Sequence, residues 1–265
     1  MSSPKVALIT AASSGLGAAI AHTLVVELGM NAVINYHRNE SRAMELAQKL
    51  QEERAAKHST SGGESPVVRA VQADVSSKSD IYNLVEKAAA TFDGRLDVVI
   101  SNVGWTQMRN FSDLDDGVNE DDWDRCYNAN VKSHLWLFHA AKPYLEAANR
   151  RDEGSAVFVS TASVAGVKPS GSSLPYAVTK SALIHLVKSL ATISAPSIRV
   201  NCVSPGILLT EWGLSFPQER LDAAKAANKL GRFATVEDVA QQVRTFVVSR
   251  TITGQNAIID AGFSL

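Results

Sequence analysis

Cysteine is scarce in this chain of 265 residues: only Cys126 and Cys202 occur, far apart and outside any CxxC motif. The scarcity argues against a disulfide framework and against a zinc site, and we expect no bound metal. Neither sign of charge is in excess, since 26 basic and 27 acidic residues give a formal net charge of −1. Composition therefore gives no reason to expect a nucleic acid or an anionic membrane as a partner.

Long hydrophobic runs are also missing. The N-terminal segment 1–14 has one lysine and an apolar run of about five residues, which is too short for the core of a signal peptide. No run reaches the length of a transmembrane helix, and the final residues, GFSL, are not a peroxisomal signal. We therefore expect a cytoplasmic globular protein.

What the chain does contain is an alternation of short apolar runs with longer helical patterns. The apolar runs are mostly continuous, which is typical of parallel strands covered by helices on both faces. Their repeated β-α-β order predicts a doubly wound, Rossmann-type parallel sheet in a single α/β domain spanning 1–265. We expect strands at 5–10, 32–36, 67–75, 96–101, 155–161, 198–203 and 256–260, helices at 14–29, 41–57, 76–93, 120–147, 175–194 and 235–249, and a surface loop at 58–66.

Ligands of such sheets bind beyond the carboxyl ends of the strands. The first of these ends carries Ser13, Ser14, Gly15 and Gly17, which open a predicted helix. Unpaired N–H groups at a helix N-terminus suit a pyrophosphate, and residues without a Cβ allow close approach. The alternative is that serine and glycine only cap a helix after a strand, and these residues alone do not decide between the two.

A second group of polar residues follows the fifth predicted strand. Ser163 precedes Tyr176 and Lys180, whose i, i+4 spacing puts the last two side chains on one helix face. An ammonium near a phenol favours the phenolate. A phenol with a pKa brought toward neutrality can donate or accept a proton while hydride moves at the attached carbon. The plain alternative is a buried tyrosine with an exposed lysine one turn away.

The ordered set of motifs resembles the classical short-chain dehydrogenase/reductase family over essentially the whole chain. No single motif decides this, but their order is specific to the family. The matching segments are TAASSGLG (10–17), ADV (73–75), SNVG (101–104), NANV (128–131), STASVAG (160–166), YAVTK (176–180), RVNCVSPG (199–206), and LGRFATVEDVA (230–240) followed by TGQNAIIDAG (253–262).

The resemblance implies a catalytic tetrad. Tyr176 would be the general acid in reduction, and Ser163 would hydrogen-bond the substrate carbonyl. Lys180 would lower the pKa of Tyr176 and bind the nicotinamide ribose, while Asn130 would hold a water that links Lys180 to solvent; the plain alternative for Asn130 is a helix-interior amide. The resemblance places the cofactor against Thr10, Ser13, Ser14, Gly15, Leu16, Gly17, Tyr36, His37, Arg38, Asn39, Asp74, Val75, Asn102, Gly104, Tyr176, Lys180, Pro205, Gly206 and Thr210.

The chain departs from the family pattern at three positions. Ala11 stands where the family has the first glycine of its glycine turn, Val103 where it has alanine, and Ala261 where it more often has glycine. Either Ala11 has a negative φ or it carries strain of about 1 kcal/mol or more. We expect the negative φ, with the methyl group beside the adenosine half of the cofactor.

The end of the second strand indicates which nicotinamide cofactor binds. An acidic residue there binds the ribose 2′-hydroxyl of NAD and repels the 2′-phosphate of NADP. The family pattern puts that position at Tyr36, and no acid follows before Glu40. Arg38 could offer its planar guanidinium to a phosphate, unless it is only a solvated surface residue. The missing acid in either case favours NADP(H).

An apolar and aromatic set follows strands four to six, which favours a hydrophobic carbonyl compound, cyclic or aromatic, over a sugar phosphate. The alternative is that several of these residues only pack a lid. The set consists of Trp105, Val164, Val167, Leu209, Trp212, Leu214 and Phe216.

We therefore expect an NADPH-dependent carbonyl reductase that also runs in reverse as an alcohol dehydrogenase. The rival functions are an NAD-linked alcohol dehydrogenase and a non-catalytic NADP-binding sensor or scaffold. An enoyl reductase is disfavoured, because its Tyr/Lys spacing is usually wider. The resemblance also implies a homodimer or homotetramer paired through the helices at 120–147 and 175–194, although both helices could instead be buried within one chain.

Overall fold

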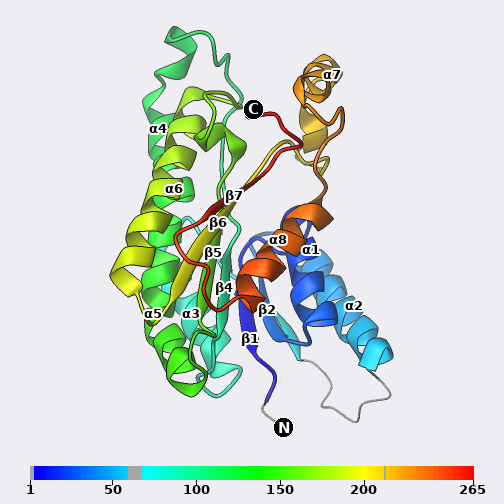
Figure 1. The fold of residues 1–265 in the computed structure, drawn as a ribbon, viewed down its shortest axis with the longest axis vertical. Helices are drawn as coiled ribbons and strands as arrows, with labels where there is room; N and C mark the ends of the chain where they lie inside the picture. Colours follow the sequence, from blue (N-terminus) through cyan, green and yellow to red (C-terminus); the bar gives the residue numbers. More distant parts are fainter. Residues whose placement is uncertain (1–2, 59–66, 212) are drawn as a thin grey trace.

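The computed structural model describes residues 3–58, 67–211 and 213–265 and shows seven parallel strands in one sheet (Figure 1). The strand order β3-β2-β1-β4-β5-β6-β7 reverses direction between β1 and β4, as in a doubly wound sheet. The predicted fold is confirmed, and each strand lies within two or three residues of its predicted place. The strands are β1 (Val6–Ile9), β2 (Asn31–Tyr36), β3 (Val68–Gln72), β4 (Val98–Ser101), β5 (Val157–Thr161), β6 (Arg199–Pro205) and β7 (Asn256–Ile259).

Helices cover both faces of the sheet because successive side chains of a strand point to opposite faces. In β1, Val6 and Leu8 pack into a core with α3, α5 and α6, whereas Ala7 and Ile9 pack into a second core with α1 and α8. Both faces are therefore dry, as the continuous apolar runs predicted. The helices are α1 (Gly15–His22), α2 (Glu40–His58), α3 (Lys78–Ala90), α4 (Glu120–Tyr127), α5 (Ser133–Arg151), α6 (Leu174–Ser194), α7 (Gln218–Ala227) and α8 (Val236–Val248).

Two predicted helices are interrupted by π-helical turns. The first helix continues from α1 into a π-helix at Thr23–Glu27 and ends before Gly29, whose φ of +73° fits the predicted stop. The predicted helix at 120–147 is α4, a π-helix at Asn128–Lys132 and then α5. Such turns are frequent at functional sites, and the second contains Asn130.

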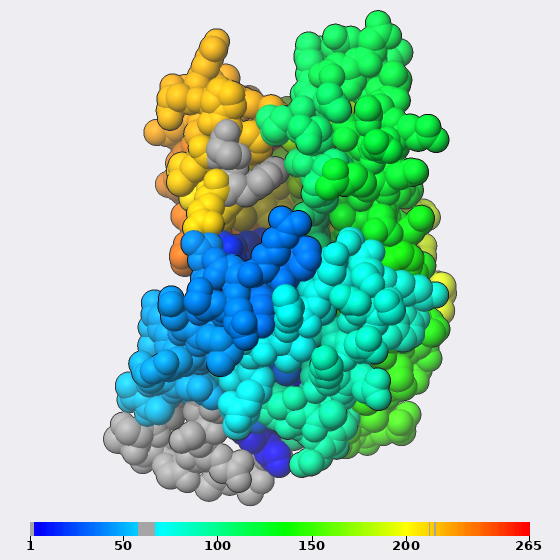
Figure 2. All heavy atoms as spheres, turned by 180° about the vertical axis from the view of Figure 1, so that it is seen from behind, coloured from blue at the N-terminus to red at the C-terminus, as the bar shows by residue number. Residues whose placement is uncertain are grey.

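The segment between β6 and α8, which includes α7, extends beyond the carboxyl edge of the sheet (Figure 1). Seen from the opposite side, the surface is hollowed between this segment, coloured yellow to orange, and the green region around α4 (Figure 2). None of the helices in the described ranges is long and apolar enough to cross a membrane. The predicted loop at 58–66 lies, apart from residue 58, outside the described residues.

Candidate active site

The turn after β1 is tighter than the sequence predicted. Ala11 has a φ of +48°, so the expected negative φ is wrong. The backbone N–H groups of Ala11 and Ala12 donate to Asn35 Oδ1 and Asn35 O at 3.1 and 2.9 Å, and these two bonds fix the turn. The left-handed conformation costs Ala11 strain of about 1–3 kcal/mol, which these hydrogen bonds offset. The exposed Ala11 lines the cleft at this point.

The two glycines of this turn have different roles. Gly15, at the start of α1, has a φ of +54° and lies in the cleft wall. A Cβ on Gly17 would lie 2.4 Å from the carbonyl oxygen of Ala11, so only glycine lets α1 approach the turn this closely. Gly17 therefore permits close packing of α1 on the turn, whereas Gly15 belongs to the wall of the cleft.

Hydroxyl and amide groups tie the neighbouring strand ends together. The backbone N–H of Asn102 donates to Thr10 Oγ1 at 2.9 Å, and Thr161 Oγ1 donates to Asn102 Oδ1 at 2.9 Å. These bonds connect the carboxyl ends of β1, β4 and β5. Thr10 is completely buried, so its predicted contact with the cofactor would be indirect, through Asn102.

Asn130 in the π-helical turn holds the segment that follows β4. Its Oδ1 accepts from the backbone N–H of Trp105 at 2.8 Å, and its Nδ2 donates to Trp105 O at 2.9 Å and to Thr179 Oγ1 at 3.0 Å. Both amide protons are therefore used, and only Oδ1 has a lone pair left for the predicted water. A Cβ on Gly104 would lie 3.4 Å from this Oδ1 and 3.2 Å from Lys180 Nζ, which shows how closely the three groups meet.

Ser163, Tyr176 and Lys180 come together because α6 packs closely on the turn after β5. Ser173 caps α6 by accepting from the backbone N–H of Tyr176 at 3.3 Å. A Cβ on Gly166 would lie 2.5 Å from the backbone of Lys180, so glycine is required at this crossing. The Ser163 hydroxyl acts to lower the pKa of Tyr176, and both residues line the cleft.

The protonation of the tyrosine differs from the expectation. Burial raises the pKa of Tyr176 to about 12, and the hydrogen bond from Ser163 opposes this rise. Burial outweighs the lowering expected from Lys180, whose Nζ donates to Thr161 O at 2.8 Å and lies 5.7 Å from the centre of the tyrosine ring. Burial lowers the pKa of Lys180 to about 8. The chain thus holds a protonated phenol beside a lysine whose charge changes near neutral pH.

A buried histidine that the sequence analysis did not single out supports the segment containing Val103. His134, one turn after Asn130, is fully buried, and its Nε2 lies 3.2 Å from Val103 O. Burial and the nearby Lys180 lower the pKa of His134 to about 3, so the ring is neutral and can donate to this carbonyl. The sequence feature that could have identified His134 is its position on the inner face of α5, four residues after Asn130.

The predicted adenosine residues gather at the ends of β2 and β3. Tyr36 is buried, and its pKa is raised by burial and by the carboxylate of Glu40. His37 Nε2 lies 3.7 Å from Asp74 Oδ2, and Arg38 helps to lower the pKa of Asp74. Asn39 accepts from the backbone N–H of Arg42 and so begins α2. Arg38 is exposed, without an ion pair within 4 Å in the part of the chain that the structure describes.

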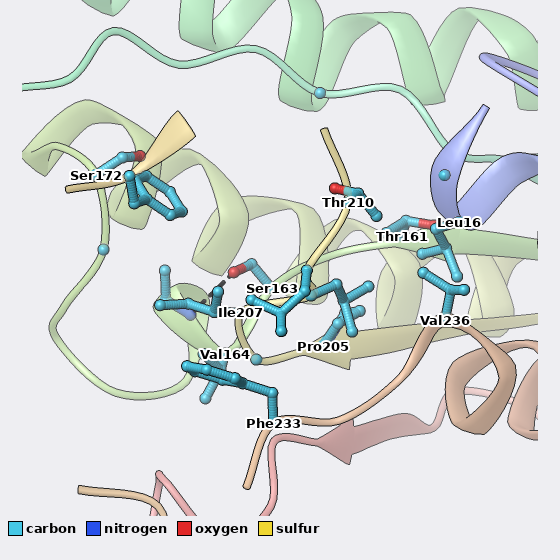
Figure 3. Close-up of a pocket in the computed structure, with 18 of the residues that line it drawn as sticks. Leu16, Thr161, Ser163, Val164, Ser172, Pro205, Ile207, Thr210, Phe233 and Val236 are labelled. Carbon is cyan, nitrogen blue, oxygen red and sulfur yellow. Dashed lines mark hydrogen bonds between the residues drawn. The ribbon is translucent and has the colours of Figure 1, made fainter. Parts of the chain in front are cut away.

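A cleft of about 770 Å³ runs along the carboxyl edge from the glycine turn to the segment before α8. Figure 3 shows Leu16, Thr161 and Thr210 at the right, Ser163 and Ile207 in the middle with Val164 and Phe233 below them, and Ser172 at the left. Of the predicted cofactor residues, the cleft is lined by Ser14, Gly15, Leu16, Asn102, Gly104, Tyr176, Pro205, Gly206 and Thr210, whereas Ser13, Gly17, Tyr36, His37, Arg38, Asn39, Asp74, Val75 and Lys180 lie outside its lining.

The predicted substrate residues divide in the same way. Val164, Leu209 and Phe216 line the cleft, but Trp105, Val167 and Leu214 do not. The ring of Trp105 lies under Arg125, with the guanidinium 4.2 Å from the ring centre, and Val167 and Leu214 are exposed. Trp212 lies outside the described residues.

The cleft also has a wall that the sequence analysis missed, made by Phe233 and Phe263. Lys168 holds Phe263 in place, because its Nζ donates to Phe263 O at 2.8 Å and lies 4.6 Å from the ring centre. Phe233 lies within the matching segment 230–240 and Phe263 directly follows the segment 253–262, but nothing in either segment indicates that these rings reach the cleft. In the described ranges, no group of three or more His, Cys, Asp or Glu side chains could hold a metal ion.

The arrangement makes this chain an oxidoreductase of the Rossmann class. Residues 5–220 match the family described as short chain dehydrogenase, and the chain belongs to that family. Among its relatives is a protein of Streptomyces violaceoruber, named provisionally as ketoacyl reductase 2 of the granaticin polyketide synthase. It is 34% identical over 262 residues, which cover 98% of this chain and 96% of the relative.

Solved structures of similar proteins cover nearly the whole chain. A short chain dehydrogenase from Burkholderia cenocepacia in complex with NADP has a TM-score of 0.83 and 28% identity, covering 98% of both chains. A 3-ketoacyl-(acyl-carrier-protein) reductase from Brucella melitensis complexed with NADH has a TM-score of 0.81 and 26% identity, again covering 98% of both chains. The family therefore binds NAD or NADP, and these neighbours differ in which one they hold.

Proposed function

We propose that this protein is an NADPH-dependent carbonyl reductase that reduces a hydrophobic ketone to an alcohol and also catalyses the reverse reaction. The observation that carries the proposal is that Ser163 and Tyr176 line the same cleft as Gly15 of the glycine turn, with Lys180 one helical turn after Tyr176 and 5.7 Å from its ring centre. The carbonyl chemistry in the names of the Streptomyces and Brucella proteins supports it.

The residues present fit a nicotinamide dinucleotide. The cleft is lined by Ser14, Gly15 and Leu16 at the N-terminus of α1, where backbone N–H groups suit a pyrophosphate. Lys180 has two further N–H donors besides the one given to Thr161 O, and these would bind ribose hydroxyls. When bound, the nicotinamide supplies the hydride.

The chain's own part in the reaction is to orient the carbonyl and supply a proton. Ser163 would donate to the substrate oxygen, and the Tyr176 hydroxyl would protonate it. A tyrosine pKa of about 12 keeps this proton in place at neutral pH, which suits reduction. The charge on Lys180 would stabilise the phenolate that remains after proton transfer, and Asn130 would link Lys180 to solvent through a water.

The end of β2 favours NADP over NAD. The position of the NAD-specific acid is Tyr36, and Arg38 is exposed beside it with an uncommitted guanidinium. A planar guanidinium binds a phosphate through two parallel hydrogen bonds. We further propose that the protein is a cytoplasmic homodimer or homotetramer.

The proposal is tested by measuring kcat/KM with NADPH and with NADH on a panel of apolar cyclic and aromatic ketones, with polar sugars as the contrasting substrates. We expect turnover of the ketones and a preference for NADPH. A preference for NADH would support the NAD-linked alcohol dehydrogenase instead. Binding of NADPH without turnover of any substrate would support a sensor or scaffold.

A further inference from the structure

Arg220 of α7 lines the part of the cleft that we propose for the substrate. Its Nη2 donates to Gly171 O at 2.6 Å, on the loop that precedes α6. Its guanidinium lies 5.1 Å from the centre of the Phe216 ring, a cation–π contact within the lining of the cleft. The side chain is half-buried, so these two contacts hold a positive charge at a fixed place inside an otherwise apolar wall.

The hydrogen-bonding capacity of this guanidinium is mostly unused. No carboxylate of the described residues forms an ion pair with Arg220 within 4 Å. A guanidinium has five N–H donors, and the hydrogen bond that Arg220 makes within the described residues goes to a neutral carbonyl, Gly171 O. A charge that is partly removed from water without a counter-ion is costly, and an anion in the cleft would offset that cost.

The other charged side chain in the cleft lining does not cancel Arg220. Glu211 lies at the cofactor end, next to Thr210, and its two carboxylate oxygens accept from Arg42 at 2.9 and 2.6 Å. The same bonds lower the pKa of Glu211. Of the charged side chains in the cleft lining, Arg220 is therefore the one without a carboxylate partner among the described residues, and Phe216, Phe233 and Phe263 belong to the same lining.

We propose that Arg220 determines substrate specificity by binding an anionic group, a carboxylate or a phosphate, on the ketone that this site reduces. The inference rests on the proposed function and narrows its substrate class: an apolar ketone body lies against the phenylalanines, and an acidic end lies against the guanidinium. Planar, bidentate recognition of either anion is the chemistry for which arginine is suited.

The test compares matched aryl ketones that end in a carboxylate, in a phosphate monoester, or in the neutral methyl ester of that carboxylate. Three chain lengths of each are used. The length that gives the highest kcat/KM then indicates the distance between the reacting carbon and Arg220. We expect wild-type kcat/KM to be highest for an acidic member. In Arg220→Met that value falls roughly 10- to 100-fold through KM, while the ester changes less than about twofold. Whichever acid shows the larger loss identifies the anion.

Arg220→Lys is expected to recover part of the loss, because an ammonium keeps the charge but lacks the planar pair of donors. Lys225→Met is the matched control, since Lys225 is an exposed cation on the same helix outside the cleft lining. Equal losses on acid and ester would show that Arg220 only fastens α7 to Gly171 and would overturn the proposal. So would a wild type that prefers the esters.

Calorimetric titration of the same acids separates this inference from the proposed function. Saturable binding of an acid by the wild type that is weakened in Arg220→Met and unchanged in Lys225→Met supports the arginine site, even where no ketone is turned over. Acid binding that is the same in all three proteins overturns it, whatever the activity.

Discussion

The two ends of the cleft differ in the atoms that form them: backbone atoms at one end and side chains at the other. The cofactor end is made largely of backbone: the turn at Ala11, the bare Cα atoms of Gly15 and Gly17, and hydrogen bonds to Asn35. The substrate end is made of side chains, including Phe216, Arg220 and Phe263, that come from segments far apart in the chain. If the proposed function is right, the first end fits the dinucleotide, and substitutions at the second end would change substrate specificity without disturbing the sheet.

The proposed tetrad lies where these two ends meet, and removing its proposed proton donor should have the largest effect. Tyr176→Phe is expected to lower kcat for reduction by about 10²–10⁴-fold, because a positioned general acid contributes that much. Stopped-flow and steady-state rates measure the loss. NADPH affinity, measured by fluorescence titration, should be nearly unchanged. A variant that keeps more than about a tenth of the activity would exclude Tyr176 as the general acid.

The second-largest effect is expected from adding a Cβ atom to the glycine turn. In Gly17→Ala the new Cβ would lie 2.4 Å from Ala11 O, so the turn or α1 must move. Overpacking of this kind costs about 1–3 kcal/mol, which corresponds to roughly 5- to 150-fold in NADPH affinity. Gly231→Ala is the control, since a Cβ there meets nothing within 4 Å although its φ of +62° also adds strain. If both variants bind NADPH alike, the turn is not the cofactor site.

The protonation of Lys180, between the two ends of the cleft, gives the next prediction. Lys180 has a pKa of about 8, so it is charged below that pH and neutral above it. We expect kcat/KM for reduction to be level below pH 8 and to fall by up to tenfold per pH unit above it, because a neutral lysine no longer stabilises the phenolate. Lys180→Met should be slow at every pH and lack this inflection. A wild-type profile that stays level to pH 10 would contradict the assignment.

The smallest expected effect is relief of strain at Ala11. Ala11→Gly removes a positive-φ cost of about 1–3 kcal/mol but adds about 0.4–1 kcal/mol of unfolded-state entropy, so the net gain is at most a few kcal/mol. Differential scanning calorimetry should show Tm higher by a few degrees. Ala261→Gly, at a φ of +54° outside the cleft lining, should raise Tm similarly without altering NADPH affinity. A lower Tm in Ala11→Gly would mean that the alanine is not strained.

Features that depend on residues close together in the sequence could be predicted from it, whereas features that depend on distant residues could not. The strands, the Tyr176–Lys180 spacing and the serine–glycine turn come from short patterns, and the structure places them together. The φ of Ala11 could not be predicted, because Asn35, 24 residues away, fixes it. Arg220 and Phe263 were missed for a related reason: α7 and the C-terminal segment reach the cleft only through tertiary packing. The pKa of Tyr176 was predicted in the wrong direction, because burial outweighs its charged neighbour.

The contact between Arg42 and Glu211 has a thermodynamic consequence. It joins α2, beside the adenosine end, to the segment that leads into α7, and Thr210 next to it lies against Gly15 of the phosphate turn. A ligand that orders one side of this contact would thereby lower the free-energy cost of ordering the other. By reciprocity, any factor by which the dinucleotide tightens ketone binding is the factor by which the ketone tightens dinucleotide binding.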